Sequence, residues 1–372
     1  MLSSLRFPLA GSRGRRYPEP EHPYRSLFQR DRARIVHARA FRRLEAKTQV
    51  FAPGISDHFR NRLTHTIEVA QIARTIAAVL GLDTDLTEAL ALVHDIGHPP
   101  FAHAGEAELN LQMVRFGEKF DHNIQALRIV ETFEQRYARF PGLNLTFEVR
   151  EGVVKHSRDF EKGEFPELDE YLPGMRPPLE SQLIDLADEI AYDGADLDDG
   201  FAAGLFRARD VADHVPAYAE LFETIETQFP GADEHDQFQE ILRLLTDWMV
   251  SGLITGTMEA AKASGARDSW EVREVKTRIA AFTPEAQKAS RDLKSFMLKF
   301  VFSNEQLAAD RRRSRTMIGE LFQFFLEHPE KLPEWHAARA VGQRAPRVVC
   351  DYIAGMTDLF FRRTYEAAIG PR

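Results

Sequence analysis

Histidines gather in one part of this 372-residue chain. Six of its 13 histidines lie within a short stretch, and they are His58, His65, His94, His98, His103 and His122. A single histidine on an apolar helix face is more often a packed core residue than a ligand. Imidazole nitrogens also bind divalent metals and transfer protons near neutral pH. A cluster of this density therefore indicates metal binding or acid–base chemistry.

The dipeptide His94-Asp95 strengthens the metal interpretation. It ends the apolar run 89–93, and an aspartate beside a core is costly unless a cation or hydrogen bonds compensate its charge. His65 and Asp188 also lie in apolar helical patterns. Two imidazoles and two carboxylates suit Mn, Fe, Co, Ni or Mg better than a structural zinc.

The composition narrows the class of protein. Hydrophobic residues make up 44% of the chain and charged residues 28%, which is typical of a globular protein with a full core. The net charge of −9 argues against a surface made to coat nucleic acid. Residues 1–47 nevertheless hold twelve basic and four acidic side chains, a local charge of +8. This segment is either a solvated basic arm or a site for an anion or a partner.

Targeting and redox signals are weak. No apolar run approaches the length of about 18 residues that could span a bilayer, and the start of the chain lacks the apolar stretch of a signal peptide. A soluble protein in the cytoplasm, without membrane contact, is therefore expected. Cys350 is the single cysteine, which excludes an internal disulfide and any cysteine-based zinc site. We expect it to be a small buried apolar residue.

Helical patterns dominate the chain after a proline-rich start. Residues 1–25 contain four prolines among glycine and charged residues, and they are predicted to form a flexible basic segment. A helix is predicted over 60–80, with Gly81 at its C-terminal cap. Thr146–Val149 is the one modest strand candidate. The further predicted helices begin near Ser26, Asp83 and Ala104 and cover 122–139, 179–192, 216–228, 236–263, 270–282, 284–300, 304–327 and 346–366.

Four stretches of sequence carry a more particular signal. They are RIVHARAFRRLEAKTQVF (34–51), HDIGHPPFAHAGE (94–106), FDHN (120–123) and DYIAGMTD (351–358). In this order, with the predicted metal ligands, they resemble the bacterial dGTPase-like branch of the HD superfamily of phosphohydrolases. The resemblance covers nearly the whole chain. It implies an all-α fold over 26–372, with an HD-type helical core at about 26–205 and additional C-terminal helices at about 206–372.

The resemblance also assigns roles to residues. It implies that His65, His94, Asp95 and Asp188 hold the metal, and that His103 and Glu106 form a catalytic pair. A carboxylate at this spacing can orient an imidazole and raise its basicity. His98 follows His94 by one helical turn and could reach a phosphate oxygen.

Other positions match those that face the nucleotide in this family, namely Gln49, Arg62, Tyr192 and Asp196. A tyrosine against the sugar would penalise a 2′-hydroxyl. Lys155 is a weaker candidate for the phosphates, because a lone lysine is usually a solvated charge. His122 with Asn123 would support the site from behind or simply pack in the core.

The implied reaction converts a dNTP into a deoxynucleoside and tripolyphosphate, by attack of a metal-activated water on the α-phosphorus. Mn²⁺ or Mg²⁺ is the expected cofactor, with Fe, Co or Ni as alternatives. The resemblance further implies a homo-oligomer, with a hexamer as the expected form, and activation by a dNTP or by single-stranded DNA. Ala102 and Leu359 depart from the family pattern, where glycine and arginine are common, so no role is carried onto Leu359.

Two other interpretations remain open. A different HD phosphohydrolase, acting on other nucleotides or on alarmones, would use the same metal ligands. A binding protein for nucleotides or nucleic acid, without turnover, would suit the basic start and the arginines of 311–315. The complete ligand set together with His103 and Glu106 favours an enzyme.

Overall fold

The computed structural model describes residues 1–49, 59–339 and 342–370, and it confirms the all-α prediction. Among these residues, β-pairing is limited to three isolated bridges. His58 of the histidine cluster lies outside the described residues. None of the described helices combines the length and the apolar composition needed to cross a membrane.

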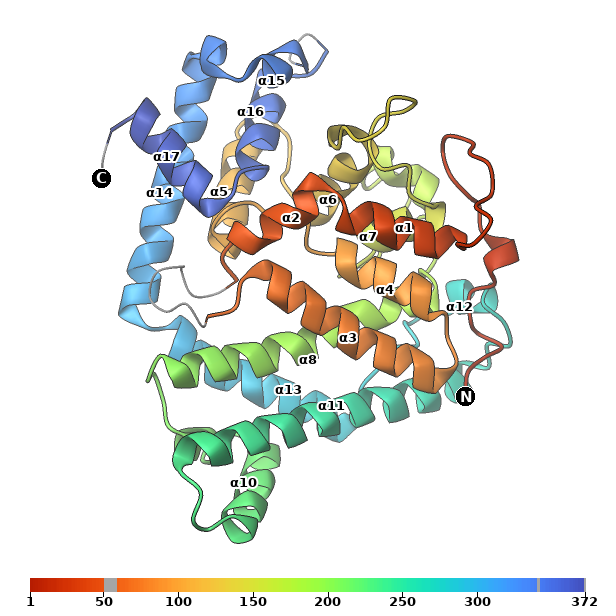
Figure 1. Cartoon of the computed structure of the whole chain (residues 1–372), viewed down its shortest axis with the longest axis vertical. Coiled ribbons are helices and arrows are strands. Elements are labelled where there is room, and N and C mark those ends of the chain that lie inside the picture. The colour runs from red at the N-terminus through yellow and green to blue at the C-terminus, as the bar shows by residue number, and fades with distance from the viewer. Residues whose placement is uncertain (50–58, 340–341, 371–372) are drawn as a thin grey trace. The chain divides into compact units, whose positions relative to one another are not determined.

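Figure 1 shows the order of the helices along the chain. They are α1 (Leu27–Val36), α2 (Arg39–Arg43), α3 (Arg62–Leu80), α4 (Thr84–Val93), α5 (Ala102–Val114), α6 (His122–Arg128), α7 (Phe147–Val154), α8 (Leu179–Ala202), α9 (Ala208–Ala212), α10 (Pro216–Gln228), α11 (Glu234–Ser264), α12 (Glu271–Glu274), α13 (Pro284–Met297), α14 (Glu305–Glu327), α15 (Glu334–Arg339), α16 (Ala345–Ala354) and α17 (Asp358–Ala368). Two π-helical turns, η3 (Ile129–Phe133) and η5 (Leu298–Phe302), continue α6 and α13.

Three predicted elements differ from the structure. The strand candidate Thr146–Val149 is wrong, because α7 begins there and buries Val149 and Val153 on one face. An apolar run this short does not distinguish the periodicity of a strand from that of a helix. The helix predicted over 270–282 shrinks to α12. The one predicted over 346–366 is divided into α16 and α17, since Thr357 caps a new helix by accepting a hydrogen bond from Phe360 N.

The chain forms two compact units, each assembled from three segments. Unit 1 comprises Met1–Arg32, His65–Leu92 and Thr146–Asn304. Unit 2 comprises Ala33–Thr64, Val93–Leu145 and Glu305–Arg372. The predicted division near residue 205 does not appear as a unit boundary. Segments far apart in the sequence therefore build each unit.

The core of unit 1 centres on α8, which packs against α11 and α13. These helices run alongside one another in Figure 1. Gly256 of α11 allows the backbone that precedes α13 to approach, because a Cβ at this position would lie 2.3 Å from the Phe282 carbonyl carbon. No side chain larger than hydrogen fits without a shift of this backbone.

The core of unit 2 centres on α14, which packs against α5, α16 and α17. Its apolar residues recur at helical spacing and are fully buried, as at Ile318, Leu321 and Phe322. Cys350 lies in the same core, which agrees with the expectation of a buried apolar residue. Burial raises the pKa of its thiol.

The N-terminal segment is ordered, so the prediction of a flexible arm over residues 1–25 is wrong. Leu5 and Phe7 are buried in unit 1, and Phe7 N donates to Glu180 Oε1 at 2.9 Å. Arg15 forms a buried ion pair with Asp31, with an N–O distance of 2.6 Å. Ion pairs formed in the folded chain therefore compensate charges that the composition alone predicted to be solvated.

Glu180 gives a test of this anchoring. Oε1 also accepts from Asp83 N at 3.0 Å, and burial raises the pKa of Glu180 from 4.5 to about 7. Because the folded pKa lies above the unfolded value, the folded state holds an extra proton, and stability is lost as the pH rises through this window. In Glu180→Gln, both hydrogen bonds remain and the charge is removed. We expect a higher melting temperature than wild type at pH 8, equivalent to at most about 3 kcal/mol, and near-identical melting at about pH 4, below the unfolded pKa.

The control for this experiment is Glu167→Gln, a change of the same kind at an exposed position. It should melt as wild type at both pH values. If Glu180→Gln also follows the wild-type pH dependence throughout, the buried carboxyl does not titrate with folding.

Candidate metal centre and active site

The dipeptide His94-Asp95 directly follows α4, and its aspartate is 5% exposed. Arg62, the first residue of α3, donates from Nη1 to Asp95 Oδ2 at 2.7 Å. His98 Nδ1 lies 3.0 Å from Asp95 Oδ1, and His94 Nε2 lies 3.5 Å from it. Burial opposes ionisation, but Arg62 and the two imidazoles outweigh it and hold the pKa of Asp95 well below its usual range. The carboxylate is thus charged and already oriented.

His65 and Asp188 meet within unit 1. His65 lies on α3 and is buried, and its Nε2 is 2.7 Å from Asp188 Oδ1 on α8. A ring nitrogen of His156 also lies within 4.8 Å of a carboxylate oxygen of Asp188. The sequence analysis missed His156, which follows α7 with no motif to mark it. Its only signal was a histidine next to the candidate Lys155.

Each unit therefore places an imidazole nitrogen opposite a carboxylate oxygen. The separations of 2.7 and 3.5 Å suit neighbouring ligands of one small cation, since ligand atoms at roughly 2.1 Å from a metal stand about 3 Å apart. The donor set of nitrogen and oxygen fits a divalent first-row metal or Mg²⁺. The residues present are chemically suited to the cofactor that the sequence predicted.

A second group of residues lies within unit 2. Glu106 of α5 bridges two histidines: its Oε1 is 2.7 Å from His122 Nδ1, and its Oε2 is 3.7 Å from His103 Nδ1. The His122 ring stacks on His98, with centroids 4.0 Å apart. The His103 side chain is 74% exposed, whereas His98 is buried. One accessible imidazole thus has a carboxylate behind it, which is an arrangement for moving a proton.

Burial and neighbouring charges shift the pKa values of this group in different directions. Burial opposes the charge of Glu106, but the neighbouring His103 ring and the hydrogen bond with His122 hold its pKa far below its usual range. For His122, burial lowers the pKa, and Glu106 more than compensates, so the net shift is upward. For His98, burial and then Arg62 lower the pKa well below its usual range. Near neutral pH, Glu106 is therefore a carboxylate and His98 a neutral imidazole.

Local sequence explains how α6 presents His122. Asp121 caps the helix by accepting from Asn123 N at 2.9 Å and from Ile124 N at 3.1 Å. A Cβ on Gly97 would lie 1.9 Å from the His122 carbonyl oxygen. Only glycine fits there, so the turn after His94-Asp95 can lie directly against the start of α6.

Comparison with known proteins identifies the family. Residues 62–193 match the HD domain, and residues 280–367 match the phosphohydrolase-associated domain. Three similar relatives, all named deoxyguanosinetriphosphate triphosphohydrolase-like protein, come from Geobacter metallireducens, Azoarcus sp. and Ruegeria sp.. They are 41%, 43% and 44% identical to this chain, over 96%, 98% and 95% of it and 93%, 96% and 96% of their own lengths.

The chain belongs to the dGTPase-like family of HD-domain proteins. The predicted resemblance is confirmed at this level, and membership supports a hydrolase that binds a divalent metal. The HD match begins at Arg62 and ends at Asp193, so it contains all four predicted metal ligands, His65, His94, Asp95 and Asp188.

The predicted nucleotide contacts are only partly described by the geometry. Tyr192 and Asp196 follow Asp188 by four and eight residues, and α8 continues through all three, so they share one helix face as expected. Gln49 is buried, and its Oε1 has no hydrogen-bond partner among the described residues. Arg62 holds Asp95 as described above. Contact of these four residues with nucleotide stays a prediction for this family member.

Lys155 is buried and hydrogen-bonded within unit 1. Its Nζ donates to Glu151 Oε1 at 3.0 Å and to the carbonyls of Leu172 and Met175 at 2.8 Å each. The side chain is fully buried, and all three ammonium hydrogens are used. All three donors are taken by protein acceptors in this arrangement, and the phosphate contact of Lys155 stays a prediction. The sequence shows Glu151 four residues earlier, but it could not show that the carbonyls of Leu172 and Met175 accept the other two hydrogen bonds.

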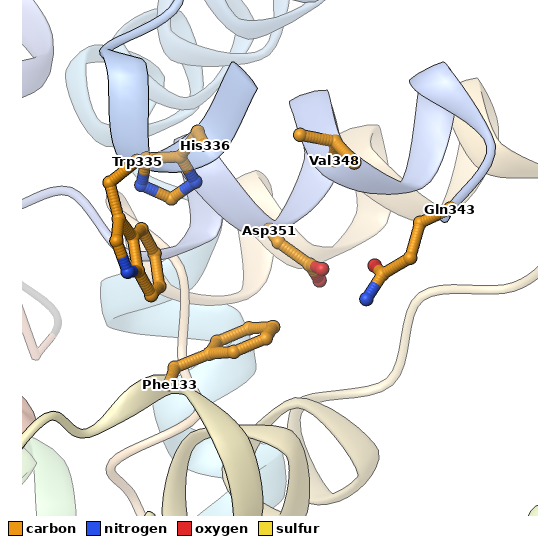
Figure 2. Close-up of a pocket in the computed structure, with 6 residues that line it drawn as sticks. All are labelled: Phe133, Trp335, His336, Gln343, Val348 and Asp351. Atoms are coloured by element: carbon orange, nitrogen blue, oxygen red, sulfur yellow. The ribbon is translucent and has the colours of Figure 1, made fainter. Parts of the chain in front are cut away.

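A pocket in unit 2 lies beside the C-terminal motif (Figure 2). Phe133, Trp335 and Gln343 surround Asp351 of α16. Asp351 is not available to a ligand, because Arg128 of α6 holds both of its carboxylate oxygens. The pocket thus marks the place where α16 is anchored to α6.

The internal role of Lys155 can be tested by Lys155→Met. We expect a lower free energy of unfolding, by about 2–3 kcal/mol, since the change leaves Glu151 and two carbonyls without a buried donor. Urea unfolding measures this. Lys162→Met, at an exposed position, is the control and should unfold as wild type. An unchanged unfolding midpoint combined with a raised KM would support the phosphate contact instead.

Proposed function

We propose that this protein hydrolyses deoxynucleoside triphosphates to deoxynucleoside and tripolyphosphate. The observation that carries the proposal is the accessible imidazole of His103 backed by the half-buried carboxylate of Glu106. This pair follows the His94-Asp95 dipeptide by only a few residues. The names of the relatives support this substrate class.

In this proposal, His65, His94, Asp95 and Asp188 hold one divalent cation, with Mn²⁺ or Mg²⁺ as the expected ion. When bound, the cation supplies Lewis-acid charge for the phosphate and lowers the pKa of a water. Arg62 keeps Asp95 ionised and oriented for this task.

The remaining residues handle one proton and orient the Asp95 carboxylate. A water oxygen bonds to the α-phosphorus, the bond from phosphorus to the 5′-oxygen breaks, and tripolyphosphate leaves the sugar. His103, whose ring Glu106 orients, donates a proton to the 5′-oxygen; the proton that the attacking water loses passes to solvent, from which His103 is protonated again. His98, held neutral, has a single N–H, which faces Asp95 Oδ1 at 3.0 Å, so His98 orients the Asp95 carboxylate. Tripolyphosphate and a deoxynucleoside with a free 5′-hydroxyl are the products.

Nucleotide selection is assigned to α8 and to the segment before α3. Tyr192 lies against the sugar, where a 2′-hydroxyl would clash, and Asp196 and Gln49 supply hydrogen-bond acceptors for the sugar and the base. The position of Tyr192 and Asp196 on the helix face of Asp188 supports this assignment. A different HD phosphohydrolase would leave a nucleoside monophosphate or another phosphate product, so product analysis separates the two functions.

The first test is product analysis with each of the four dNTPs. Metal-loaded protein, with Mn²⁺ and then Mg²⁺, should release deoxynucleoside and tripolyphosphate, and chelation should abolish turnover until metal is restored. Asp95→Ala should lose roughly 10³-fold or more in kcat/KM, because the contribution of a bound metal is several kcal/mol. Chromatography of nucleosides and phosphates measures both results.

The matched control is Asp247→Ala, which changes an aspartate whose side chain is 71% exposed on α11. It should retain wild-type turnover. Absence of turnover with any dNTP, alone or in mixtures, would contradict the proposed function. Release of monophosphate would point to another reaction of the HD superfamily.

Sugar selection is tested at Tyr192. Tyr192→Ala should lower the ratio of kcat/KM for dGTP over GTP by about tenfold or more, since one steric contact of this kind is worth about 1.4 kcal/mol. Tyr192→Phe keeps the ring and should keep the ratio. Equal ratios in wild type and in Tyr192→Ala would remove Tyr192 from sugar selection.

A further inference from the structure

The backbone that connects His98 to His103 has an unusual conformation. Phe101 and Ala102 both adopt positive φ angles, of 63° and 53°, although neither is glycine. For residues with a Cβ, this left-handed conformation is disfavoured and persists only when the surroundings impose it. Something outside the loop must therefore hold Phe101 in place.

The first turns of α17 hold Phe101 from three sides. Asp358 Oδ1 accepts a hydrogen bond from Phe101 N at 3.1 Å. The Phe101 ring packs edge-on against Phe361, with centroids 5.1 Å apart, and the Arg362 guanidinium lies 5.2 Å from the ring centroid. Positions 358, 361 and 362 share one face of a helix, so α17 presents them together.

The same carboxylate holds a second segment. Asp358 Oδ2 accepts from Thr48 N at 2.9 Å and from the Thr48 hydroxyl. The preceding residue, Lys47, donates from its buried ammonium to the carbonyl of His98. Asp358 is itself buried, so these bonds form away from water. One side chain of α17 thus ties Thr48 to the loop that separates His98 from His103.

We propose that Asp358 is a positioning residue for the phosphohydrolase reaction: by holding Phe101 it fixes His103 and Glu106 relative to His98. Asp358 does not touch the reacting atoms in this account and acts only through the loop. The inference rests on the proposed function. It gives the C-terminal DYIAGMTD motif, which lies in the phosphohydrolase-associated domain, a positioning role that acts through this loop.

The test uses Asp358→Asn, which has nearly the same shape. An amide offers one acceptor oxygen, so either Phe101 N–H or Thr48 N–H must face an NH₂ group. We expect kcat for dNTP hydrolysis to fall by roughly tenfold to a hundredfold while KM changes little, because misplaced catalytic groups lower the rate without removing substrate contacts. The Thr357→Ala control removes the cap of the same helix without touching the loop, and it should keep kcat within about twofold.

Two further variants distinguish positioning from general loosening. Ala102→Gly, added to Asp358→Asn, should recover at least about threefold in kcat, because glycine takes the left-handed conformation without strain. Arg362→Met should lower kcat by about threefold through its contact with the Phe101 ring, whereas Arg363→Met, at the exposed neighbouring position, should not. If Asp358→Asn does not fold, the Arg362 and Arg363 pair decides the proposal alone.

Hydrogen exchange of the 98–108 peptide, read by mass spectrometry, gives a measure that does not depend on turnover. Exchange should rise in Asp358→Asn and stay at the wild-type rate in Thr357→Ala. Wild-type kcat in folded Asp358→Asn, or equal losses in Asp358→Asn and Thr357→Ala, would overturn the proposal. Absence of turnover in wild type would instead refute the proposed function, and unchanged exchange in Asp358→Asn would then refute the loop contact as well.

Discussion

The burial of the Asp95 carboxylate is the constraint on which the site depends. A carboxylate almost removed from water is tolerated only when charge and hydrogen bonds replace its hydration. Arg62 supplies the charge from the first residue of α3, and His98 supplies a ring nitrogen from the following turn. This requirement fixes the start of α3 and the turn after α4. The predicted metal ligand is oriented by protein groups alone.

Packing against the turn after α4 positions the other candidate catalytic residues. Gly97 lets α6 lie directly on the turn, α6 brings His122 onto the ring of His98, and Glu106 then meets His122. The result is a neutral His98 in the interior and an accessible His103 at the edge. Protonation states within one small group of residues are thereby separated by burial and by pairing.

The cost of burying an uncompensated charge also explains why several charged residues stabilise the fold. Glu151 is fully buried, and Lys155 and Arg273 together compensate its charge in unit 1. Arg15 does the same for Asp31, so part of the basic N-terminal segment is structural. In unit 2, Asp351 and Asp358 of one sequence motif hold α6 and the active-site loop. Residues of the phosphohydrolase-associated domain thus contact the loop between His98 and His103, which lies in the HD domain.

The sequence by itself determined the helical class, the family and the residues capable of metal and proton chemistry, because helical periodicity and motif spacing are local properties. It also predicted the cap at Gly81, which indeed has a positive φ of 79°. Only the tertiary structure decided which partner each charge takes, as for Arg62 with Asp95 and Arg273 with Glu151, and it gave an ordered start where a flexible arm was expected. Partners distant in sequence are chosen when packing removes water from both, and no local pattern records that choice.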